Sequence, residues 1–278
     1  MIEEVRRVSS MQNHAVRVKA AVDLMAELQD AVIETSRIRK ESIAWLREHG
    51  HSMADVAKIM GVSRARVAQL RDVGPPAERA FLGRRHLRVA VPQRVGERQY
   101  VTVEDSATGQ KLLGLAHRLQ LNGELEYIPT TGEIDLNRDE LIVVCGPKSS
   151  AVIAEALRKD PQLSFEMLPD GRWAIIERRS GRVHTSPSDA PTDSIPGDIA
   201  YFGRLSRPDG KGSFLLIAGV HAVGSLGVAH FLSNNLATLY HRVGTADFSM
   251  VIGCDYSTET KAVSGSRELT QALLHEVT

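Results

Sequence analysis

Residues 52–70 constrain the fold most, because two helix caps and a glycine stand at fixed spacing within one short run. Ser52 is a favourable N-cap, and apolar residues recur after it at helical spacing. Gly61 stands where this first helix should end, since glycine tolerates a positive φ. Ser63 then provides the cap of a second helix. The run predicts two short helices joined by a three-residue turn.

The second predicted helix has a polar, basic outer face, because Val67 and Leu70 take its inner positions. Helix-turn-helix proteins place such outer side chains against phosphates and base edges of double-stranded DNA. An ordinary pair of surface helices is the alternative, but the caps, the turn and the basic face together favour DNA binding. The residues predicted to contact DNA are Ser63, Arg64, Arg66, Gln69 and Arg71.

Residues 30–72 resemble the helix-turn-helix modules of actinobacterial regulators, which are akin to the last DNA-binding region (region 4) of sigma factors. The stretch from Glu34 to Ala57 carries most of this resemblance. The resemblance implies binding to a promoter or operator, without identifying the site.

The distribution of charge agrees with a DNA-binding head on a different kind of body. The chain has 278 residues and zero net charge, yet residues 1–90 hold 16 Lys and Arg against 11 Asp and Glu. A basic head tethered to an acidic remainder is typical of a DNA-binding module joined to a domain that does not touch DNA. Cys145 and Cys254 both lie in apolar runs, so we expect buried side chains and no metal site.

No apolar segment follows the charged N-terminal residues, and no run of 18 apolar residues occurs. We therefore expect no signal peptide, no membrane span and a cytoplasmic protein. Residues 14–48 have helical periodicity and form either one long helix or two. We expect this stretch to serve either as a packing partner for the two short helices or as a dimer seam. A homodimer is the expected assembly. Gly74–Pro76 cannot continue a helix, so we predict a helical domain over 1–73, a linker over 74–87 and a second domain over 88–278.

The second domain alternates apolar strands with helices, which is typical of an α/β fold. Continuous apolar runs at 140–145 and 213–219 favour strands buried on both faces of a parallel sheet. The pattern predicts a Rossmann-like, mixed but largely parallel sheet with an antiparallel meander inserted. We expect further strands at 87–91, 99–103, 125–128, 199–205 and 248–254, and helices at 107–121, 151–159 and 228–240.

Three segments are predicted to leave the carboxyl end of a strand and open a helix, which is where open α/β sheets bind ligands. Glycines would let the backbone approach a phosphate-bearing or nucleotide-like ligand, and hydroxyls and a lysine would hold it. No phosphate-binding loop or dinucleotide fingerprint is present, and plain helix capping is the alternative. The predicted ligand residues are Asp105, Ser106, Gly146, Lys148, Ser149, Ser150, Gly219, His221, Gly224, Ser225 and Gly227.

The runs 144–150 and 214–227 resemble an uncharacterised domain fused to actinobacterial helix-turn-helix heads and, more loosely, Rossmann-type nucleotide sensors. The resemblance implies architecture and no particular chemistry. We therefore predict a transcriptional regulator whose α/β domain senses a small ligand or mediates oligomerisation. Two alternatives stay open: an enzyme acting on a nucleotide or nucleoside and localised by the head, or a non-catalytic scaffold. Ser225 or Cys145 with His221 and Asp105 would supply the residue types of a nucleophile, a base and an orienting group. No nucleophile elbow occurs, and we assign no catalytic residue and no cofactor.

Overall fold

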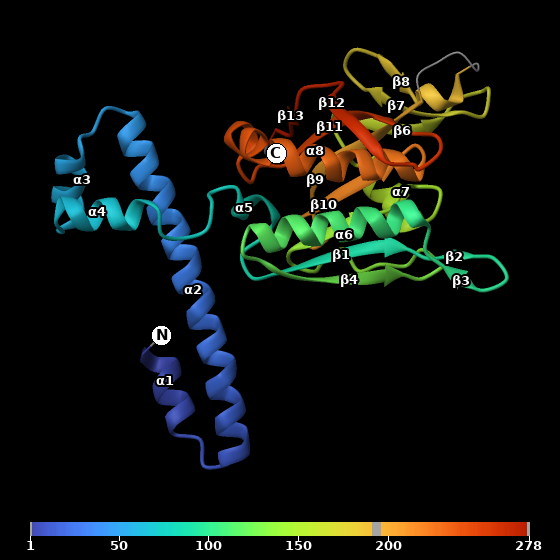
Figure 1. Cartoon of the computed structure of the whole chain (residues 1–278). Coiled ribbons are helices and arrows are strands. Elements are labelled where there is room, and N and C mark those ends of the chain that lie inside the picture. Colours follow the sequence, from blue (N-terminus) through green and yellow to red (C-terminus); the bar gives the residue numbers. More distant parts are fainter. Residues whose placement is uncertain (1, 191–195, 277–278) are drawn as a thin grey trace. The chain divides into compact units, whose positions relative to one another are not determined.

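The structure is a computed structural model that describes residues 2–190 and 196–276. The chain divides into two compact units, with the division after Arg79. Figure 1 shows the elements of both units, a helical first unit and a second unit built on a sheet. Among the described residues, no helix is both long and apolar enough to cross a bilayer.

Before the division at Arg79, the described part of the first unit contains four helices, and α2 is one continuous helix of 35 residues. Asn13 begins α2, since its side chain accepts hydrogen bonds from the backbone N–H groups of Ala15 and Val16. α1 packs along the N-terminal half of α2 (Figure 1). The four helices are α1 (Ile2–Ser9), α2 (His14–Glu48), α3 (Met53–Met60) and α4 (Arg64–Arg71).

The helices α3 and α4 have the caps and the turn that the sequence predicts. Ser52 and Asp55 form a reciprocal capping box at the start of α3. Gly61 ends α3 with φ of 66°, the left-handed conformation that glycine adopts most easily. Ser63 Oγ accepts a hydrogen bond from Arg66 N at 3.1 Å and begins α4. A small core of Ile43, Val56, Ala57 and Val67 holds the end of α2 against both helices.

The second unit is an α/β fold around an eight-stranded mixed sheet of order β12-β11-β9-β10-β5-β1-β4, with β13 paired to β11. The strands β4, β1, β5 and β10 pair in parallel. Beyond β10 the pairings are antiparallel, so β11 runs with the parallel group and β9 and β12 run against it. The strands are β1 (His86–Pro92), β4 (Asn122–Ile128), β5 (Leu141–Val144), β9 (Gly197–Ser206), β10 (Ser213–Gly219), β11 (Phe248–Tyr256), β12 (Val263–Glu268) and β13 (Leu273–Leu274).

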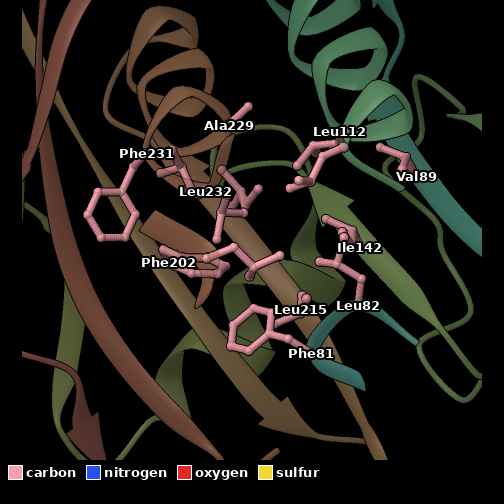
Figure 2. Packing of buried hydrophobic residues seen from close by; sticks show 14 of the residues in the cluster. Phe81, Leu82, Val89, Leu112, Ile142, Phe202, Leu215, Ala229, Phe231 and Leu232 are labelled. Atoms are coloured by element: carbon pink, nitrogen blue, oxygen red, sulfur yellow. The ribbon is translucent and has the colours of Figure 1, made fainter. Parts of the chain in front are cut away.

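Helices cover both faces of this sheet because successive strand residues are apolar on either side. α6 (Val103–Arg118) and α8 (Ala222–Val243) lie side by side on one face. Figure 2 shows Leu112 of α6 and Leu232 of α8 packing toward Ile142, Phe202 and Leu215 of the sheet. On the other face lie α7 (Ala151–Arg158) and the small antiparallel sheet β6 (Leu163–Met167), β7 (Trp173–Glu177) and β8 (Val183–Thr185).

The second unit begins earlier than the predicted boundary at residue 88. Phe81, Leu82 and Leu87 fall within the predicted linker, yet they are buried in the core cluster of this unit. The short helix α5 (Arg79–Leu82) spans the division. The Glu140 carboxylate accepts a hydrogen bond from the backbone N–H of Arg85 at 2.9 Å, which fixes the turn before β1. Residues 74–79 of the predicted linker therefore belong to the first unit, and residues 80–87 belong to the second.

Two predicted helix starts are also wrong. α6 begins at Val103 and not near 107, because Thr102 caps it. The strand expected at 99–103 is therefore reduced to β3 (Gln99–Tyr100). β3 forms a hairpin with β2 (Arg94–Val95). α8 begins at Ala222 and not at 228, so Gly224 and Gly227, which were expected in a loop, are helical.

Candidate functional site

The predicted ligand segments around Lys148 and His221 converge on one edge of the sheet. β1, β5 and β10 are adjacent and parallel, so the segments that follow them lie together at their carboxyl ends. Lys148 Nζ donates to Val220 O at 2.8 Å, and Cys145 N donates to Ile217 O at 3.0 Å. A Cβ on Gly146 would lie 3.8 Å from Gly219 O. Both segments therefore belong to one carboxyl edge.

Asp198, which the sequence analysis did not select, occupies the N-terminus of α8. Its Oδ2 accepts hydrogen bonds from Gly224 N at 2.6 Å and from His221 N at 3.1 Å. The side chain is buried, and burial raises the pKa of this carboxyl. The α8 N-terminus thus already holds an acidic group of the protein itself. A phosphate at this helix end, which the glycine pattern suggested, would have to compete with this carboxylate.

The glycines and Ser225 at this edge serve the packing of α8 against the sheet. A Cβ on Gly224 would lie 2.3 Å from Ile199 O, and one on Gly227 would lie 2.6 Å from the Cβ of Cys254. Ser225 Oγ accepts a hydrogen bond from Gly219 N at 3.1 Å. These contacts explain the residue types without any ligand.

Lys148 and His221 are the predicted residues whose charged or polar ends remain exposed at the edge. His221 Nε2 lies 2.8 Å from Asp189 Oδ1. Lys148 Nζ also lies 5.3 Å from the centre of the Trp173 ring. Partial burial lowers the pKa of Lys148, although Asp189 and Asp198 act in the opposite direction. The Lys148 ammonium therefore lies near the carboxylates of Asp189 and Asp198 at this edge.

Asp105 and Ser106 lie in the first turn of α6 and not in a loop, which corrects their predicted setting. Thr102 Oγ1 donates to Asp105 Oδ2 at 2.8 Å and accepts from Asp105 N, so the pair caps α6. Arg94 lies 3.5 Å from the same carboxylate, and burial is the main effect, raising the pKa of Asp105.

Ser149 precedes the cap of α7, and Ser150 is that cap. Ser150 Oγ accepts from Ile153 N at 3.2 Å and donates to Gly132 O. The Ser150 side chain is buried, so both of its hydrogen-bonding roles are internal to the fold.

The described part of the second unit contains two further hollows. One, of about 260 Å³, lies between β4 and the segment Glu133–Asp135. The other, of about 620 Å³, lies between Gln162, the β7 end at Glu177 and the strand β13. Neither is lined by a residue that the sequence analysis selected for a ligand.

Apart from the cap residue, the side chains predicted to contact DNA are exposed along α4. Arg64, Arg66 and Gln69 are exposed along α4, and Arg66 Nη1 donates to Gln69 Oε1 at 3.2 Å. Arg71 is also exposed and pairs with the adjacent Asp72. Ser63 acts through its cap at the start of α4. α4 therefore presents a basic, solvent-facing surface that needs no rearrangement of the core.

The two cysteines of the second unit are poorly set to act as nucleophiles. Burial raises the pKa of both Cys145 and Cys254 to about 12, so neither is a thiolate near neutral pH. A buried group that the sequence analysis missed combines Ser249, His275 and Asp160. His275 Nε2 lies 3.1 Å from Ser249 Oγ and 3.7 Å from Asp160 Oδ2. Because one ring nitrogen faces both partners, this group lacks the relay geometry of a hydrolase.

Comparison with protein-family models, with curated proteins and with solved structures gives no match for this chain.

Proposed function

We propose that the chain is a DNA-binding transcriptional regulator whose first unit binds duplex DNA through a helix-turn-helix formed by α3 and α4. The observation that carries the proposal is the pair of capped helices joined at Gly61, with α4 presenting Arg64, Arg66 and Gln69 to solvent. In such units the second helix enters the major groove with its N-terminal residues toward the base edges.

The packing of α3 against α4 in the first unit supports this proposal. Val56 and Val67 are fully buried between the helices, so the spacing of α3 and α4 is set by packing and the outer face is free for a partner. Arginine is the side chain that most often forms paired hydrogen bonds with guanine and also binds phosphate. An exposed α4 with two arginines near its start therefore suits both base edges and the phosphate backbone.

The test is binding of the full chain to genomic DNA fragments, with the wild type compared with the double variant Arg64→Ala, Arg66→Ala. Each lost contact is worth about 1–3 kcal/mol, so the double variant should bind at least ~10-fold more weakly. Arg179→Ala, at an exposed arginine on the second unit, is the matched control and should bind like the wild type. Equal affinity of the double variant and the wild type would remove α4 as the DNA-contacting helix.

For the second unit we propose a sensing role at the carboxyl edge, where Lys148 and His221 are the exposed cationic or ionisable residues. An anionic small molecule, such as a nucleotide, would contact Lys148 and the start of α7 and avoid the end of α8 that Asp198 occupies. This role rests on the convergence of the segments after β5 and β10.

A further inference from the structure

The outward face of α4 has two alanines and a glutamine at its centre. Successive residues of a helix are ~100° apart around its axis. Val67 is fully buried and Leu70 is partly buried, so these two residues mark the inner side of α4. Ala65 and Ala68 each precede one of them by two residues, which places them ~200° away, on the outward side. Gln69 follows Ala65 by four residues and shares that side. We call Ala65, Ala68 and Gln69 the α4 centre, and all three are exposed.

Arg64 and Arg66 lie on the two flanks of the α4 centre. Arg64 precedes Ala65 by one residue and Arg66 follows it by one, so they lie ~100° from it in opposite directions. Both side chains are exposed. A helix in the major groove has base edges opposite its centre and a phosphate backbone on each side. In such a groove the two arginines would extend toward phosphates, and the α4 centre would face the base edges.

Arg66 also orients the side-chain amide of Gln69. Its Nη1 donates a hydrogen bond to Gln69 Oε1 at 3.2 Å. An amide oxygen has two lone pairs and an amide nitrogen has two donors, so Gln69 can still accept a hydrogen bond at Oε1 and donate from Nε2. Adenine presents the matching pair in the major groove, an N6 amino donor beside the N7 acceptor. Because Arg66 orients the amide before DNA binds, less side-chain freedom is lost on binding.

We propose that α4 recognises A·T base pairs in the major groove, with Gln69 binding an adenine. This inference rests on the DNA binding proposed above and adds which base pairs the helix selects. The methyl groups of Ala65 and Ala68 suit the C5-methyl of thymine, the apolar group that an A·T pair presents in this groove. A guanine or cytosine at the same place would bring polar groups that alanine cannot pair.

Guanine recognition by arginine is the alternative, because arginine is a common partner of guanine in protein–DNA complexes. It would require Arg64 or Arg66 to leave its flank and turn across the α4 centre. For Arg66 this turn would also break the hydrogen bond to Gln69. The arrangement of α4 therefore favours adenine and thymine opposite its centre.

The test is selection of binding sites by the full chain from a pool of random duplexes, followed by sequencing. We expect A·T pairs to be enriched in the selected site, and Gln69→Ala to lose the preference for adenine at one position. The variant should bind the wild-type site about 5- to 150-fold more weakly, since a good paired contact discriminates between bases by that factor. Gln29→Ala, at an exposed glutamine of α2, is the matched control and should select the wild-type site with wild-type affinity.

Base analogues in the selected duplex test each contact separately. 7-Deazaadenine lacks the N7 acceptor, so it should weaken binding by the wild type and leave binding by Gln69→Ala nearly unchanged. Uracil in place of thymine lacks the C5-methyl, so it should weaken binding by the wild type ~4-fold for each methyl that an alanine covers.

The possible failures separate this inference from the proposed function. Enriched G·C pairs that depend on Arg64 or Arg66, or a selected pool without base preference, would overturn the recognition of A·T pairs while DNA binding by α4 stands. An equal loss of affinity on 7-deazaadenine by the wild type and Gln69→Ala would overturn the contact between Gln69 and adenine. A chain that binds no duplex at all would refute the proposed function itself.

Discussion

The close approach of α8 to β9 at Gly224 predicts that two glycine-to-alanine substitutions in helices have opposite effects. Gly114 is an exposed position inside α6, where an added Cβ meets nothing within 4 Å. Alanine there should stabilise the fold by about 0.5–1 kcal/mol, because glycine loses more backbone entropy on folding. Gly224 is also helical, yet its added Cβ would lie 2.3 Å from Ile199 O and 2.8 Å from Asp198 Oδ2.

The loss of stability expected for Gly224→Ala follows from the shift that the added Cβ requires of α8. Ordinary contacts begin near 3.4 Å, so the start of α8 must shift by about 1 Å, and overpacking of this kind costs about 1–3 kcal/mol. The shift also weakens the hydrogen bonds of Gly224 N and His221 N to buried Asp198, at about 1.5–3 kcal/mol for a charged acceptor. After subtracting the gain in helix propensity, we expect a net loss of about 2–5 kcal/mol.

Thermal unfolding of the two full-length variants, followed by circular dichroism, measures this difference. Gly224→Ala should lower Tm by about 5–15 °C, and Gly114→Ala should raise it by about 1–4 °C. The second variant controls for the general effect of alanine in a helix. A Gly224→Ala protein as stable as the wild type would refute the close approach of α8 to β9 and the placement of Asp198 at its end.

Two further predictions concern pH and ligand binding. Burial lowers the pKa of His275 in the folded chain, so the folded state binds fewer protons than the unfolded state, and stability should fall as pH drops below about 6.5. His275→Gln should remove this part of the pH dependence in denaturant titrations, and an unchanged pH profile would contradict the burial of this ring. A mono- or dinucleotide that binds the carboxyl edge should raise Tm of the wild type but not of Lys148→Ala, since a ligand bound only by the folded state stabilises it. A panel without any shift, or an equal shift in both proteins, would count against the sensing role.

Local signals in the sequence were sufficient for the caps and the turn of α3 and α4. Ser52, Gly61 and Ser63 act on neighbours within four residues, so their positions alone predict the caps and the turn. The same holds for the buried strands β5 and β10, whose continuous apolar runs indicate coverage on both faces. Convergence of the segments after these strands followed once both were assigned to one parallel sheet.

The predicted details that failed depend on distant partners. Asp198 comes from β9, whose antiparallel course brings its first residues to the edge where β10 ends, and no local pattern shows this pairing. Phe81 and Leu82 stand near prolines and arginines, so the local sequence predicts a linker there. They are buried because they pack against strands that come later in the sequence. A glycine-rich run fits a ligand loop and a close helix contact equally well, and the tertiary partner decides between them.

The salt dependence of DNA binding tests the central claim most directly. If α4 contacts phosphates, the logarithm of the association constant of the wild-type chain should fall linearly with the logarithm of salt concentration, by about 0.9 per phosphate contact on duplex DNA. The double variant Arg64→Ala, Arg66→Ala should show a slope smaller by up to about 2, because each lost phosphate contact reduces it by about 1. Identical slopes for the two proteins, or binding that does not change with salt, would contradict DNA recognition by this unit.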